Sequence, residues 1–252
     1  MPGYVMHLAV AEQIIKLCRI TGIEDCNELR IGSIVPDTRK GNEKRQSHFW
    51  TDEEYIRFAR KPDLQMFLNK YSDMLAKPYV FGYYAHLYLD YKFVKEYWSL
   101  HYMFYDKNMQ PVDIYDAVEW VRYIDTDELV LRRDFFSEQY YYGDYDRMNR
   151  YMLLHYGIET PRYESDMIRA GGVEEVEGRE TDQILKEMIS FLERETSAEE
   201  AERLQSAQAI QQSLKAFSLS GMQQLIEQTA AELGEIYEIV TRNESHMQSQ
   251  RK

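Results

Sequence analysis

The feature that most constrains the fold is a long stretch, from Tyr79 to about Tyr105, that is aromatic and apolar almost all round a helix. A helix on a protein surface keeps a polar face, whereas a helix that is apolar on every side is buried. The stretch therefore predicts a helix at the centre of a bundle, covered by other elements.

Two polar residues interrupt this stretch one turn apart. His86 and Asp90 are four residues apart, so their side chains share one face of a helix. A buried carboxylate is costly unless it is paired, hydrogen-bonded or bound to metal, and the same holds more weakly for an imidazole. Taken alone, a pair at this spacing is more often a structural hydrogen bond than a metal site, so the choice depends on the residues around it.

The rest of the chain also has helical periodicity. Proline and glycine are scarce, strands of alternating pattern are not evident, and apolar residues recur at helical spacing. We expect an all-α, multi-helix bundle. A capping box from Thr51 to Glu54 predicts a helix that begins just after His48. Further helices are expected at 7–18, 63–75, 113–124, 128–155 with a break near Gly143, 181–195, 197–217 and 220–240.

A change of composition predicts three parts. Residues 1–162 form a metal-binding helical domain, and 163–180 form a flexible, solvated acidic connection with two adjacent glycines. Residues 181–252 form a C-terminal helical extension. Its helices either pack back on the main body, which we favour, or join subunits of a homo-oligomer.

Charge and composition exclude several classes of protein. The net charge of −13 argues against broad nucleic-acid binding, which needs a basic surface. No stretch has the length and apolarity of a membrane span, and the first residues lack the pattern of a secretory signal. We therefore expect a cytoplasmic protein. Its only cysteines, Cys18 and Cys26, are expected to be reduced thiols.

Three more polar residues are predicted to lie inside. His7 falls on the same helical stripe as the apolar residues of its segment. Asp37 follows Ile-Val-Pro, and His48 precedes Phe-Trp, so apolar neighbours anchor both to the core. Together with His86 and Asp90 they form a mixed nitrogen and oxygen set, which suits zinc, with manganese or iron as alternatives.

The order of these residues resembles the zinc-dependent phospholipase C family, which is related to single-strand-specific nucleases. The resemblance rests on His7, Gly-Ser-Ile-Val-Pro-Asp37, Ser-His48-Phe, and the sequence Gly-Tyr-Tyr-Ala-His86-Leu-Tyr-Leu-Asp90. It covers residues 1–105 clearly, and 106–160 only as a helical pattern. It does not extend to the C-terminal third.

The resemblance implies a helical fold with one or two zinc ions that cleaves phosphate esters. Asp37, His48, His86 and Asp90 correspond to one metal site, and Asp90 would bridge to a second ion that His7 also holds. The pattern that binds a third ion in the family is absent from this chain. Asp37 is the candidate to orient the attacking water.

Four cations lie between two of the expected ligands and are candidates to bind a substrate phosphate: Arg39, Lys40, Lys44 and Arg45. They are equally consistent with a solvated surface loop. We expect a small phosphoester or nucleotide as substrate rather than a lipid. Two alternatives remain open: a metal-stabilised protein without catalysis that binds a partner, and a metal-free bundle in which these residues bond to each other.

Overall fold

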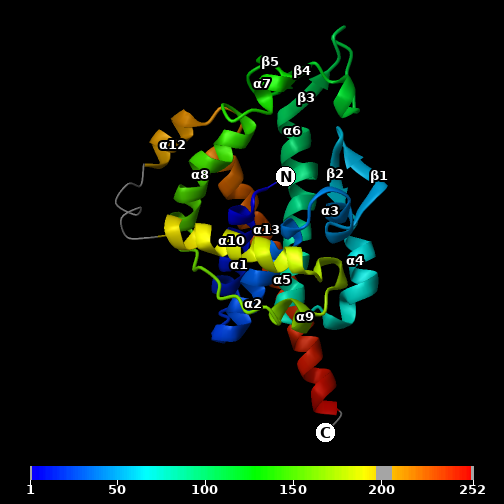
Figure 1. Cartoon of the computed structure of the whole chain (residues 1–252), viewed down its shortest axis with the longest axis vertical. Coiled ribbons are helices and arrows are strands. Elements are labelled where there is room, and N and C mark those ends of the chain that lie inside the picture. The colour runs from blue at the N-terminus through cyan, green and yellow to red at the C-terminus, as the bar shows by residue number, and fades with distance from the viewer. Residues whose placement is uncertain (1, 197–205, 251–252) are drawn as a thin grey trace.

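The computed structural model of the chain describes residues 2–196 and 206–250 (Figure 1). The helices are α1 (Tyr4–Leu17), α2 (Ile23–Ile34), α3 (Gly41–Ser47), α4 (Leu64–Tyr71), α5 (Pro78–Lys92), α6 (Ser99–His101), α7 (Arg132–Phe135), α8 (Tyr141–His155), α9 (Met167–Gly171), α10 (Arg179–Glu195), α12 (Ala207–Ser213) and α13 (Leu219–Gln250). The strands are β1 (Trp50–Ile56), β2 (Ala59–Pro62), β3 (Tyr102–Tyr105), β4 (Trp120–Tyr123) and β5 (Leu129–Leu131). Short helical turns are η1 (Val35–Thr38), η2 (Ser72–Met74), η3 (Phe93–Trp98), η4 (Tyr115–Ala117) and η5 (Glu174–Val176).

The expected central helix is α5, which packs against α1, α2, α4 and α13. Its approach to α2 is unusually close. A Cβ atom on Gly82 of α5 would overlap the carbonyl oxygen of Leu29, and one on Gly32 of α2 would overlap the carbonyl oxygen of Tyr79. Both positions therefore have room only for glycine. The backbones of α2 and α5 are in direct contact at Gly82, one helical turn before His86.

The chain is mostly helical, as expected, and it also contains two small antiparallel sheets that the sequence analysis did not predict. The residues 51–54, expected to begin a helix, lie in strand β1, which pairs with β2. The second sheet has the order β3, β4, β5 and lies at the end of the molecule that also carries α7 (Figure 1).

The central aromatic stretch also ends earlier as a helix than expected. After α5 the chain continues through the π-helical turn η3 and the short helix α6. It then forms strand β3, where burial alternates: Tyr102 and Phe104 are buried, and Met103 and Tyr105 are partly exposed. Unbroken aromatic composition hides this two-residue period. The helix expected at 113–124 is likewise replaced by η4 and β4, and the one at 128–155 by β5, α7 and α8.

The segment 163–180 is packed on the main body. Ile168, Val173 and Val176 are buried, so the expected solvated connection is not what the structure contains. Lys70 of α4 forms ion pairs with Glu174 and Glu175, at 2.9 and 2.7 Å. The acidic residues of this segment thus contact a cation of the main body.

The C-terminal helix α13 packs along α1 and α5, and Figure 1 shows its first part behind the other helices and its red C-terminal part projecting beyond them. Asp144 of α8 secures the chain that leads into it. Its carboxylate is fully buried and accepts hydrogen bonds from the backbone N–H groups of Lys215, Ala216 and Phe217. Residues 197–205, the first part of the helix expected at 197–217, lie outside the described residues.

Within the described residues, none of the helices combines the length and the apolar character that crossing a membrane requires.

Candidate metal centre

Five polar side chains from four elements meet beside the contact between α2 and α5. His7 comes from the first turn of α1, Asp37 from η1, and His48 directly follows α3. His86 and Asp90 lie one turn apart on α5. The segment 32–37 continues α2 and then forms η1, which brings Asp37 back toward α5.

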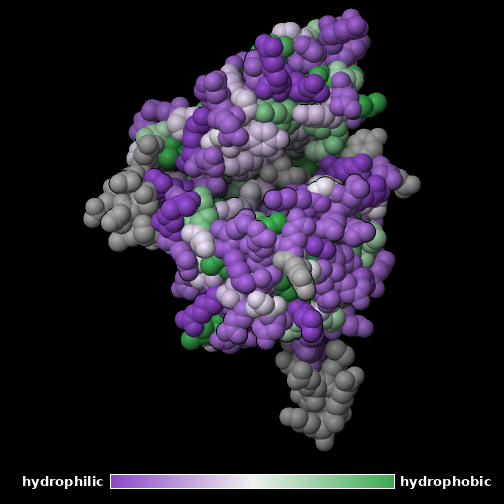
Figure 2. All heavy atoms as spheres, viewed as in Figure 1, coloured by the Kyte–Doolittle hydropathy of each residue, from purple (hydrophilic) through white to green (hydrophobic). Residues whose placement is uncertain are grey.

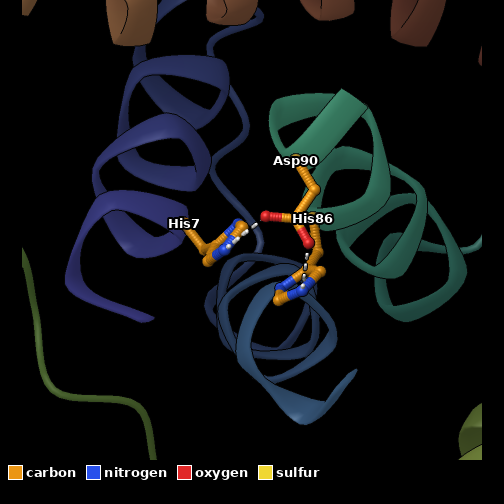
Figure 3. A group of neighbouring side chains, drawn as sticks. All are labelled: His7, His86 and Asp90. Carbon is orange, nitrogen blue, oxygen red and sulfur yellow. Dashed lines mark ion pairs between the residues drawn. The ribbon is translucent and has the colours of Figure 1, made fainter. Parts of the chain in front are cut away.

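The distances within this cluster are those of groups that can share a small cation. Asp90 is central: its carboxylate oxygens lie 3.6 Å from Nε2 of His7, 3.6 Å from Nε2 of His48 and 3.7 Å from Nε2 of His86. Figure 3 shows His7 and His86 directed toward Asp90 from two helices. Asp37 lies 3.4 Å from Nε2 of His48 and 4.0 Å from Nε2 of His7.

Two subsets have the geometry of a three-ligand metal site. They are His7, His86 and Asp90, and Asp37, His48 and His86, with the donor atoms of each subset within 4.8 Å of one another. The side chains of all but Asp37 are almost completely buried, and Asp37 is 13% exposed. The cluster therefore opens to its surroundings on the side of Asp37.

Several of these buried atoms have no hydrogen-bond partner within the protein. They are both ring nitrogens of His7 and both carboxylate oxygens of Asp90. A buried charged or polar group without a partner costs several kcal/mol in rough terms, and native structures contain few of them. Of these atoms, Nε2 of His7 and the two oxygens of Asp90 face one another across the cluster, where a bound cation would satisfy them.

Hydrogen bonds to the far side of two imidazoles direct their Nε2 atoms into the cluster. The Nδ1 atom of His86 lies 2.8 Å from the carbonyl oxygen of Ser33, so Nδ1 carries the proton. The Nδ1 atom of His48 lies 2.9 Å from the hydroxyl of Ser47, which itself donates to the carbonyl of Pro36. Metal-binding histidines are typically oriented in this way by a second hydrogen bond.

The Nε2 atoms of these two imidazoles lie 3.2 Å apart. The proton on Nδ1 of His86 leaves a lone pair on its Nε2, which can accept a hydrogen bond from His48 when His48 carries its proton on Nε2. When both protons are on Nδ1, both Nε2 atoms are free to bind a cation. The donor set, three imidazoles and two carboxylates, is one that zinc accepts.

The surroundings keep the imidazoles neutral and ready to bind metal. Burial lowers the pKa of His7 to about 3, and burial also lowers the pKa values of His48 and His86. Burial opposes ionisation of Asp37, but Lys44 and the neighbouring imidazoles still hold its pKa well below the ordinary value. Burial and the charge of Asp37 raise the pKa of Asp90 well above its ordinary value.

These shifts predict that the metal-free protein loses stability on acidification. Below about pH 6.5 the unfolded chain binds protons on His7, His48 and His86, whereas the folded chain does not, so unfolding becomes more favourable as the pH falls. Asp90 acts in the opposite sense, because its raised pKa lets the folded state hold a proton that the unfolded state releases. The three histidines outweigh Asp90, so we expect the free energy of unfolding to fall by about 1–3 kcal/mol between pH 7 and pH 5.

Urea unfolding of chelator-treated protein at the two pH values measures this loss. His7→Leu is expected to reduce it, and His101→Ala, which removes an imidazole outside the cluster, is expected to leave it unchanged. An equal loss in the His7→Leu variant would show that other groups cause the pH dependence.

A hollow of about 700 Å³ lies on the open side of the cluster, with Asp37 and Lys44 in its lining. Figure 2 shows it facing the viewer, between α10 and the part of the molecule that contains α7 and α8. Its other lining residues are Pro2, Gly3, Tyr4, Phe58, Ala59, Phe93, Trp98, Phe136, Glu138, Tyr141, Tyr142, Tyr145, Asp146, Asn149 and Met188. The volume is in the range of small-molecule sites.

Of the four candidate cations, the structure brings Lys44 to the cluster. Its Nζ lies 3.1 Å from Oδ1 of Asp37. Arg39 instead donates to the carbonyl oxygens of Glu175 and Glu177, and Arg45 forms an ion pair with Asp52 at 2.9 Å. Lys40 is exposed at the start of α3. Because α3 is a helix and not an extended loop, successive cations point in different directions.

Sequence reasoning did not find the far wall of the hollow. Glu138, Tyr142, Asp146 and Met188 lie 100 or more residues from Asp37 in the chain and belong to no recognisable motif. They reach the hollow because α8 packs against α1, and α10 packs against η1. No sequence signal short of the fold itself identifies them.

Comparison with known proteins does not assign the chain to a family: no protein-family model, curated protein or solved structure matches it.

Proposed function

We propose that the chain is a metal-dependent hydrolase of phosphate esters, with zinc as the first candidate metal and manganese or iron as alternatives. The observation that carries the proposal is a set of five convergent donors, four of them buried, beside a hollow large enough for a small ester. The resemblance of these residues to the zinc-dependent phospholipase C family supports the same activity.

The residues have distinct roles in this proposal. His7, His48, His86 and Asp90 would hold one or two ions, and Asp37 would complete the site on the side of the hollow. A divalent ion, when bound, lowers the pKa of water toward about 7 and polarises a phosphoryl oxygen. Asp37 is positioned to orient the attacking water, because its carboxylate borders both the cluster and the hollow.

Turnover of model esters tests the activity. We expect the zinc-loaded protein to hydrolyse 4-nitrophenyl phosphate or its bis ester, a chelator to stop the reaction, and added metal to restore it. His86→Ala should be inactive under the same conditions. One metal ion per chain without turnover of either ester would contradict the hydrolase proposal.

The second candidate is a metal-stabilised protein that acts by binding a partner. The near-complete burial of four of the five donors favours it, because structural metal sites are closed whereas catalytic ones keep an open position. Stoichiometric metal that raises the melting temperature, without turnover of any ester, is the result expected for this alternative.

A further inference from the structure

Resting on the proposed function, we infer that Lys44 binds the phosphate of the substrate, and that the hollow selects an ester with one phosphate joined to an uncharged, apolar group. The first half of this inference concerns a single residue, and the second concerns the charge and composition of the walls.

Lys44 occupies the boundary between the cluster and the hollow. Its side chain is 30% exposed and lines the hollow, and one contact of its ammonium group is the carboxylate of Asp37. An ammonium group has three N–H donors, so a bond to Asp37 leaves two donors for a ligand in the hollow. A phosphate that lies in the hollow beside Asp37, next to the cluster, would therefore also contact the ammonium group of Lys44.

Among the described residues that line the hollow, the charged side chains other than Lys44 are negative. Lys44 is the one lysine or arginine of these described lining residues. Two exposed carboxylates also line the hollow: Glu138, just before α8, and Asp146, within α8. A second anionic group on the substrate that reached this wall would approach these carboxylates, and no other described lysine or arginine lines the wall to offset them. Like charges at short range disfavour binding, and the walls thus select against polyanions.

The rest of the wall is aromatic. Phe58, in the turn between β1 and β2, packs edge-on against Trp98 with ring centroids 5.7 Å apart, and Trp98 packs edge-on against Tyr141 at 5.8 Å. Phe93 and Phe136 extend the same surface. Apolar area removed from water stabilises a complex by about 25 cal/mol per Å². An organic group without charge fits this wall, and Lys44 fixes the orientation of its phosphate.

Three phosphonates, which the enzyme cannot hydrolyse at the phosphorus–carbon bond, test the inference by calorimetry on the zinc-loaded protein. Phenylphosphonate is expected to bind about tenfold more tightly than methylphosphonate, because only the former covers the aromatic wall. Adding a carboxylate, in 4-carboxyphenylphosphonate, is expected to weaken binding about tenfold. The double variant Glu138→Gln, Asp146→Asn should remove that penalty.

Lys44 is tested by substitution in the same assay. We expect Lys44→Met to weaken both phenylphosphonate and methylphosphonate about 30-fold, as for loss of a hydrogen bond to a charged group. Lys44→Arg should recover most of the affinity. Lys107→Met, on an exposed turn outside the lining of the hollow, is the matched control and should bind as the wild type does.

Elemental analysis of every sample separates this inference from the proposed function. Unchanged phosphonate affinity in Lys44→Met with its metal retained would overturn the role of Lys44. Loss of phosphonate affinity in Arg45→Met but not in Lys44→Met would overturn it as well. Tighter binding of the carboxylated phosphonate would overturn the selection against anions. Phosphonate binding without turnover would remove the hydrolase but keep Lys44. Absence of metal in the wild type would remove the metal-dependent hydrolase, and the comparison of Lys44→Met with the wild type would then still test anion binding by Lys44.

Discussion

His86→Ala is expected to lower the affinity for zinc at least about 100-fold and to leave the purified protein without stoichiometric metal. His86 is the residue common to both three-ligand subsets, so its loss disrupts each of them. Its Nδ1 is held by the carbonyl of Ser33, which leaves Nε2 as the donor that the alanine variant removes. Metal per chain, measured by elemental mass spectrometry after purification without chelator, gives the result directly.

The matched control is His101→Ala. His101 stacks on Tyr97 and forms an ion pair with Asp125 at 3.7 Å, away from the five residues of the cluster. This variant should retain its metal. Equal metal content in the wild type, His86→Ala and His101→Ala would show that the ions bind elsewhere, and absence of metal from all three after reloading would leave the metal-free bundle as the remaining interpretation.

Gly82→Ala is expected to destabilise the fold by about 3 kcal/mol or more, because the new methyl group must push α5 away from the carbonyl of Leu29. At the size of this chain such a loss lowers the melting temperature by roughly 6–12 °C. The same displacement moves His86, one turn further along α5, away from the Ser33 carbonyl. We therefore expect weaker zinc binding in the fraction that folds.

Gly234→Ala on α13 provides the control for this prediction. Its Cβ would lie 3.6 Å from Sγ of Cys18, an ordinary contact, and alanine favours a helix over glycine by about 1 kcal/mol. Thermal unfolding should show a neutral or slightly raised melting temperature. Similar melting temperatures for both variants would contradict the close contact between α2 and α5.

The sequence could identify those residues of the candidate site that are polar but lie in apolar surroundings, because burying such side chains is energetically costly. His86 and Asp90 stand out because a carboxylate and an imidazole interrupt an apolar helix, and Asp37 and His48 because apolar neighbours surround them. Each of these is a local signal. Their convergence depends on the glycine contact between α2 and α5, which sequence alone does not specify.

The errors at sequence level also have physical causes. Strand β3 continues an aromatic run, so the change from a helical to a two-residue period is carried by only Tyr102 and Phe104. The Thr51–Glu54 capping pattern lies in strand β1, whose pairing with β2 outweighs local helix preference. For Arg39 and Arg45, the sequence showed the charge but not where each side chain points, because that depends on their positions around η1 and α3.

The candidate ligands and one part of the wall of the hollow come from separate stretches of the chain. All five candidate ligands lie within residues 7–90, whereas Phe136, Glu138, Asp146 and Met188 lie far beyond them. In the proposed hydrolase, changes between 136 and 188 would therefore alter the shape and charge of the hollow while the candidate ligands stay intact. Exchanging this later stretch is the natural way to change which molecules the hollow accepts.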